Sequence, residues 1–222
     1  MKRREFITLS AASLGGVLIY TLGGEPLTLN AEEGTVRVPL RFFTEDEAAI
    51  VSAACERIFP SDESGPGAKE AGVIVYIDHQ LAGPYGRDEY RYALGPFVAS
   101  EAVHGYGGKE NPQEMYRAGI KDLGADFAGL GAADQDARLR AMEKSLFFQM
   151  LRSHTLEGMF CDPMHGGNAN LIGWQMIGFP GPRMSYRKEI GVYNQGEAWR
   201  VKPKSLQQIL GRPVKGWEEE GR

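Results

Sequence analysis

Two polar residues in the C-terminal half of this sequence have a spacing that could support metal chemistry. His154 and Glu157 are three residues apart in a helical pattern, a spacing that can place two metal ligands on one helix face. A carboxylate-bridged metal site would need a second such pair and further acidic residues, which the sequence does not provide. We therefore expect no metal site, and we expect His154 to be a structural histidine whose hydrogen bonds are satisfied within the protein.

The two cysteines raise the question of thiol chemistry. Cys55 falls on an apolar helix face and should behave as a small hydrophobic residue. Cys161 stands beside Asp162 and near His165, which would shift the pKa of its thiol in opposite directions, so no thiol enzyme is indicated. Cys161 could be unpaired, bonded to Cys55 if the Cα atoms lie within about 7 Å, or bonded to another chain.

Motifs of the common enzyme and nucleic-acid-binding classes are missing from the sequence. It has no G-x-S-x-G nucleophile elbow, no G-x-G-x-x-G between a strand and a helix, and no P-loop lysine. The net charge is -4, and no basic block interleaves with aromatic residues. We therefore expect no catalytic residue and no nucleic-acid partner.

A segment rich in glycine and aromatic residues follows the helical pattern that starts at Ser145. The helix must end near Asp162-Pro163, because proline lacks an N–H and clashes with the preceding turn. The large apolar side chains that follow need a covering surface, which is either this chain or a second protein. In the second case the interface candidates are Asp162, Pro163, Gly166, Gly167, Asn168, Trp174, Phe179 and Pro180. In the alternative, Trp174 and Phe179 cap the core of this domain.

Helical periodicity dominates the middle of the chain. Thr44 and Glu47 fit a capping box, and apolar residues then recur at spacings of three and four as far as Phe59. Similar patterns over residues 68–81, 111–127, 133–142 and 145–161 predict a mainly α protein. We expect a single domain of about five or six helices over residues 44–186, with long loops rich in glycine, proline and aromatic residues. Residues 32–43 would be an extended linker, and residues 187–222 an extended C-terminal tail.

An aromatic loop separates the second and third of these helices. It contains Tyr85, Tyr90, Tyr92 and Phe97, interrupted by glycine and proline. Packing of these rings onto the helices is the favoured interpretation. Stacking on a sugar or on a partner protein is the alternative.

The N-terminus has the form of an export signal. Arg3 and Arg4 precede a polar residue and Phe6, and a mildly apolar stretch follows over residues 7–24. This pattern is typical of the twin-arginine pathway, which exports folded proteins. We assign residues 1–31 to such a signal peptide, or to an N-terminal anchor if it is retained. The alternative is a basic tail before an ordinary helix.

The sequence as a whole resembles the gluconate 2-dehydrogenase subunit 3 family, over residues 40–185 and in the signal. The resemblance is carried by Arg3-Arg4-x-Phe6, Glu56-Arg-Ile-Phe-Pro60, Gly65-Pro-Gly-Ala-x-Glu-Ala-Gly72, Tyr76-Ile-Asp-x-Gln-Leu-Ala-Gly-Pro-Tyr85, His154-Thr-Leu-Glu-Gly158, Asp162-Pro-Met-His-Gly-Gly-Asn168, Gly173-Trp174 and Ile177-Gly-Phe-Pro-Gly181.

The resemblance implies a non-catalytic small subunit. It would bind no cofactor itself and would escort an FAD-containing large subunit, of the glucose–methanol–choline oxidoreductase type, through the twin-arginine translocase. A c-type cytochrome subunit would accept the electrons. The complex would lie in the periplasm, on the outer face of the cytoplasmic membrane. The competing expectation is a stand-alone periplasmic sugar-binding module or enzyme.

Overall fold

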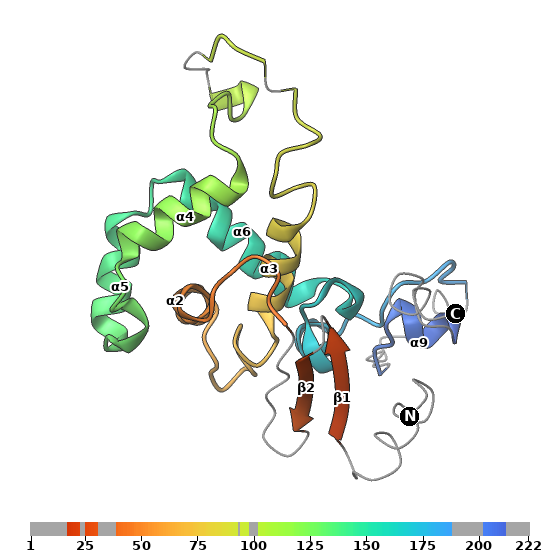
Figure 1. Ribbon diagram of the computed structural model, residues 1–222. Coiled ribbons are helices and arrows are strands. Elements are labelled where there is room, and N and C mark those ends of the chain that lie inside the picture. The colour runs from red at the N-terminus through yellow and green to blue at the C-terminus, as the bar shows by residue number, and fades with distance from the viewer. Residues whose placement is uncertain are drawn as a thin grey trace. The chain divides into compact units, whose positions relative to one another are not determined.

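The structure is a computed structural model of the 222-residue chain. It describes residues 17–22, 25–30, 39–92, 94–97, 102–187 and 202–211 (Figure 1). The chain divides into two compact units, Met1–Arg41 and Phe42–Arg222. The predicted signal residues Arg3, Arg4 and Phe6 lie outside the described residues, so the export signal stays a prediction.

In the first unit, strands β1 (Val17–Leu22) and β2 (Glu25–Asn30) pair as an antiparallel hairpin. Val17 stands opposite Asn30, and Leu22 stands opposite Glu25. Only two glycines separate the strands in the sequence, a pair that favours the tight turns of hairpins. The sequence analysis did not predict this hairpin.

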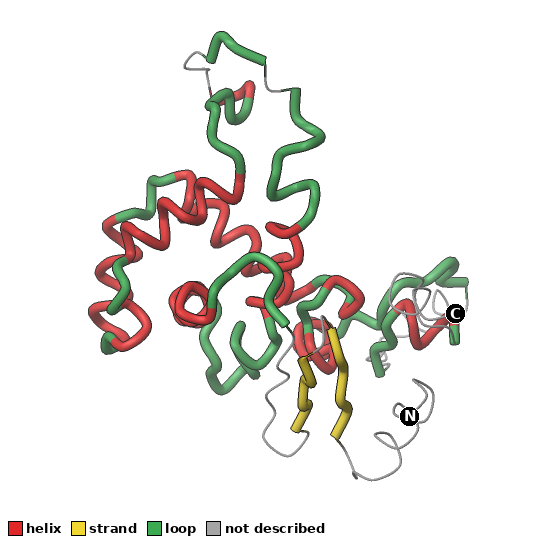
Figure 2. Tube along the Cα trace, viewed as in Figure 1, coloured by secondary structure: helices red, strands yellow, loops and turns green. Residues whose placement is uncertain are grey.

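The second unit is built from helices, as Figure 2 shows by the red segments. The α-helices are α2 (Glu45–Ile58), α3 (Val73–Ala82), α4 (Pro112–Leu123), α5 (Ala132–Ala141), α6 (Leu146–Phe160), α7 (Ile172–Ile177) and α9 (Leu206–Leu210). Short 3-10 turns lie at Ala102–His104, Phe127–Gly129, Pro163–His165 and Ala169–Leu171. The prediction of a mainly helical domain is confirmed.

Helices α2 and α4 both begin at capping boxes. The Thr44 hydroxyl accepts from the Glu47 N–H at 3.3 Å, while the Glu47 carboxylate accepts from the Thr44 N–H at 2.9 Å. Asn111 and Glu114 make the same reciprocal pair, with both distances 2.9 Å, ahead of Pro112 in α4. Each box satisfies two backbone donors that a helix start leaves open. The predicted starts of α2 and α4 are therefore confirmed.

Helix α6 is the centre of the core, since it contacts α2, α3, α4 and α7. The fully buried side chains around it include Val51, Ile77, Leu81, Tyr116, Leu123, Phe127, Leu151 and Met159. Gly119 of α4 lets Phe147 of α6 approach closely, because a Cβ at Gly119 would lie 2.1 Å from the Phe147 ring. Any larger residue at Gly119 would push α4 away from α6.

The start of the helical unit is tied to α3. The backbone N–H groups of Phe42 and Phe43 both donate to Oδ1 of Asp78, each at 3.0 Å. Asp78 is fully buried. Arg117 of α4 donates to the Phe42 carbonyl at 3.0 Å and lies over the Phe42 ring at 4.4 Å. Residues 42–43 therefore form a strap fixed to two helices.

Part of the predicted C-terminal tail is helical. Residues 202–211 include α9, which begins at a capping box between Ser205 and Gln208. The Leu206 N–H donates to Asp162 at 2.7 Å, and the Lys204 N–H donates to the Pro180 carbonyl at 3.2 Å. These bonds hold this part of the tail against the turn that follows α6.

Candidate functional site

The segment predicted as an interface, residues 162–180, contains two 3-10 turns and α7 and packs against the end of α6. It is the turn that follows α6. Its polar side chains bond within the chain. Asp162 accepts from the Met164 N–H at 3.1 Å as well as from Leu206. Asn168 is fully buried, donates to the Cys161 carbonyl at 2.8 Å and accepts from the Gly173 N–H at 2.8 Å.

The glycines of this segment permit close backbone contact. A Cβ at Gly167 would lie 2.3 Å from the Gly158 carbonyl oxygen, and one at Gly173 would lie 2.0 Å from that of Met159. Gly166 takes φ +99°, in the region that favours glycine. Residue types that looked suited to a partner surface are thus required by the fold itself.

Trp174 lies in the core, with 4% of its surface exposed. Its indole N–H donates to the Phe160 carbonyl at 2.7 Å, and its ring meets Phe179 edge to face at 5.0 Å. Carbonyls at a helix end lack intrahelical partners, and a buried indole needs an acceptor, so the contact satisfies both. Trp174 is thus buried within this chain, as in the core alternative, and its assignment to an interface stays a prediction. Pro180 is also buried, while Pro163 and Phe179 are half-buried.

The two cysteines are not bonded to one another. Cys55 is buried between α2 and α6, where it accepts from the Thr155 hydroxyl at 3.3 Å, and burial raises the pKa of its thiol to about 12. Cys55 lies beside Thr155, whereas Cys161 follows α6 and lies about 9 Å further along the helix axis than Thr155, which keeps the two cysteines apart. Burial also raises the pKa of the half-buried Cys161 thiol, to about 11. A bond from Cys161 to another chain stays a prediction.

His154 joins two tyrosines in the core. Its Nδ1 lies 2.8 Å from the Tyr116 hydroxyl, and its Nε2 lies 3.0 Å from the Tyr85 hydroxyl. In a neutral imidazole one nitrogen donates and the other accepts, so one tyrosine accepts and the other donates. Burial lowers the pKa of His154, which favours this neutral form. The prediction of a satisfied structural histidine is confirmed.

Glu157, one turn further along α6, accepts from the Tyr76 hydroxyl of α3 at 2.8 Å. Burial is the main cause that raises the pKa of Tyr76, and this hydrogen bond is the second. The sequence analysis singled out His154 and Glu157 but missed Tyr76 and Tyr116. These two tyrosines lie on the apolar faces of α3 and α4, and no local signal distinguishes them from ordinary core aromatics.

The loop between α3 and α4 is described at residues 83–92, 94–97 and 102–111, which are called the arm below. It extends away from the ends of both helices, as the yellow-green segment of Figure 1 shows. Tyr90 is 85% exposed and Tyr92 is 84% exposed. The prediction that the aromatic rings of this loop pack onto the helices is wrong for these two. Tyr85, at the base of the arm, contacts the core through His154.

The helical unit matches the family model described as gluconate 2-dehydrogenase subunit 3, over residues 45–181. The chain belongs to this family. As a subunit 3 protein, it is a subunit of a dehydrogenase complex. No curated protein and no solved structure matches the chain.

The family match extends from α2 to Gly181, so it includes both the arm and the turn that follows α6. Within the described residues of this subunit, no three His, Cys, Asp or Glu side chains gather as metal ligands would. None of the helices that the structure describes has the length and apolar character needed to cross a bilayer.

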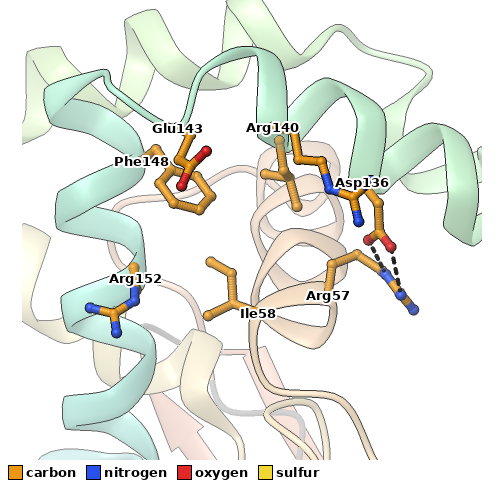
Figure 3. A pocket seen from close by; sticks show the side chains of 8 residues that line it. Arg57, Ile58, Asp136, Arg140, Glu143, Phe148 and Arg152 are labelled. Atoms are coloured by element: carbon orange, nitrogen blue, oxygen red, sulfur yellow. Dashed lines mark hydrogen bonds and ion pairs between the residues drawn. The ribbon is translucent and has the colours of Figure 1, made fainter.

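Among the cavities formed by the described residues of the helical unit, two border α6. One, of about 460 Å³, lies between α2, α5 and α6 (Figure 3). Arg57 and Asp136 face one another at its edge in a bidentate ion pair, with distances of 2.7 and 3.1 Å. The figure shows Arg152 on the other side, with Ile58 and Phe148 between. The second cavity, of about 380 Å³, lies at the base of the arm beside α4 and α6.

Proposed function

We propose that this chain is the non-catalytic small subunit that binds, stabilises and escorts an FAD-dependent large subunit of the glucose–methanol–choline type. The two would leave the cytoplasm together through the twin-arginine pathway. The complex would then work in the periplasm, at the outer face of the cytoplasmic membrane, and pass electrons to a c-type cytochrome subunit. The family match over residues 45–181 carries the proposal.

The polar residues that could have supported chemistry also favour a structural role. His154 is hydrogen-bonded through both ring nitrogens to Tyr85 and Tyr116. The carboxylate of Glu157 is hydrogen-bonded to Tyr76. The raised pKa values of the Cys55 and Cys161 thiols keep both protonated at neutral pH, so neither is a ready nucleophile. A subunit that serves mainly by binding needs an exposed apolar surface, and the arm offers one.

The first test is purification of the tagged chain from its native host, followed by an absorption spectrum and a gel. A large partner in roughly equal amount, with flavin absorption bands, is the expected result. A lone, colourless chain would favour the competing reading, a stand-alone sugar-binding module or enzyme, and a ligand screen would then follow.

The export step has its own test. Replacing Arg3 and Arg4 together by lysine should leave dehydrogenase activity in the cytoplasm, because the paired arginines are the feature that the pathway reads. Lys2→Gln alters a neighbouring charge and keeps the pair, so it is the matched control. Normal periplasmic activity from the double variant would rule out the escort role while leaving subunit binding intact.

A further inference from the structure

We infer that the arm, together with the cavity at its base, is the docking site for the large subunit. The surface that it recognises would be an apolar protein segment whose anchoring side chain enters the cavity. This inference rests on the proposed function and adds to it the face of the subunit and the chemistry of the contact.

The first argument is the area of exposed apolar surface on the arm. Leu94 is 71% exposed, Val103 is 82% exposed and Phe97 is 42% exposed, in addition to the tyrosines already described. With Tyr85, Tyr90 and Tyr92, these side chains expose on the order of 900 Å², comparable with the roughly 800 Å² that one partner contributes to a standard interface. A surface of this size and composition is costly to leave in water.

The second argument is the cavity, whose walls are mainly apolar. Leu146 and Met150 of α6, Met115 of α4 and the rings of Tyr85 and Tyr106 line it. Leu146 is itself 49% exposed, so apolar surface is accessible at the cavity. A cavity near exposed apolar side chains can hold one buried anchor residue of a partner, and such residues contribute most of the binding energy.

The third argument is the guanidinium of Arg91, which is fixed in the cavity wall. Its Nε pairs with Asp88, its Nη1 donates to the Gly108 carbonyl at 2.8 Å, and the group lies 5.1 Å from the centre of the Tyr106 ring. Its Nη2 is buried and has no acceptor among the described residues. The contacts of Arg91 with Asp88, Gly108 and Tyr106 hold this wall of the cavity in place before a partner binds.

The base of the arm is already ordered for such a contact. Gln113 of α4 donates through its side chain to the Leu81 carbonyl at 2.7 Å and through its backbone to the Gly86 carbonyl at 3.2 Å. A Cβ at Gly86 would lie 1.8 Å from the Leu81 carbonyl oxygen, so the arm leaves α3 in direct backbone contact with it. Binding to a preordered base costs less conformational entropy than binding to a loose loop.

A sugar fits the cavity less well than a protein segment. Sugars need several polar groups, yet the carboxylates on the cavity wall are already engaged. Asp88 pairs with Arg91, Glu110 accepts from Tyr106 and Glu157 accepts from Tyr76. The exposed apolar surface also extends well beyond the cavity, further than a small ligand would cover.

The test co-expresses the full tagged chain with the large subunit and measures the flavin that co-purifies. In the arm variant, Tyr90, Leu94 and Val103 are replaced together by serine. In the control variant, Ile177, Ile209 and Leu210, also exposed, are replaced by serine. All six side chains are at least 46% exposed, so thermal unfolding of each isolated variant should match that of the wild type. The arm variant should retain at most a tenth of the flavin, and the control variant should retain most of it.

The outcomes separate the two levels of the argument. If the wild type brings down no flavoprotein, the proposed function fails. If the wild type and the arm variant bring down equal amounts, the arm is not the docking site, although the proposed function stands. Two further results would overturn the assignment: a wild-type dimer that the arm variant abolishes while flavin still co-purifies, or thermal stabilisation of the isolated chain by a sugar.

Discussion

Asn168→Ala should destabilise the helical unit far more than an ordinary polar substitution. The change leaves the buried Gly173 N–H and the Cys161 carbonyl without partners. An unpaired buried group costs about 1–3 kcal/mol. Asn168 also has φ +48°, where alanine is disfavoured relative to asparagine by roughly 1 kcal/mol. The expected loss is about 3–7 kcal/mol of the free energy of unfolding, a large share of the 5–15 kcal/mol of a typical domain.

The matched control is Asn170→Ala. Asn170 has φ +56° but is exposed, so its substitution carries the backbone cost of roughly 1 kcal/mol without orphaning a buried partner. Urea unfolding of both purified variants, followed by circular dichroism, gives the two free energies. Equal losses would refute the reasoning, because they would show that the side-chain hydrogen bonds of Asn168 contribute nothing beyond its backbone conformation.

Three further predictions concern packing, pH and thiol reactivity. Gly167→Ala should cost about 3 kcal/mol or more, because its Cβ would meet a carbonyl oxygen at 2.3 Å, whereas Gly131→Ala, with nothing within 4 Å, should be neutral in the same urea assay. Burial lowers the folded-state pKa of His154. The neutral side chain therefore contributes its full stabilisation above about pH 6.5, and this contribution is lost as the pH falls from that value towards the folded-state pKa. His154→Gln should weaken the pH dependence of the urea midpoint between about pH 7 and 5. Cys161 and Cys55 should react with a thiol reagent at neutral pH much more slowly in the folded than in the unfolded chain, and rapid labelling of the folded protein would contradict their raised pKa values.

The features predictable from the sequence are those set by neighbours along the chain. The capping pairs Thr44–Glu47 and Asn111–Glu114 are three residues apart, and both form. The helix that ends before Pro163 was equally predictable, since proline cannot extend it. The apolar periodicity placed Cys55 in the core for the same local reason.

The features that could not be predicted depend on contacts between distant residues. The hydroxyl of Tyr76 meets Glu157 across 81 residues, and that of Tyr116 meets His154 across 38. Trp174 is buried because a carbonyl at the end of α6 stands 2.7 Å from its indole nitrogen, which periodicity does not reveal. Tyr90 is exposed because the arm extends away from the helices. The composition of the loop did not indicate whether its aromatic rings would be exposed or would pack onto the helices.

The strap at Phe42 and Phe43 has a mechanical consequence. Tension on the chain from the preceding residues enters the helical unit at this point, where two N–H groups share Oδ1 of Asp78. Detaching the strap requires both bonds to break together with the contacts of Arg117. The load therefore passes into α3 and α4, which flank the base of the arm. A partner bound to the arm would be drawn along with the helical unit while that unit stayed folded.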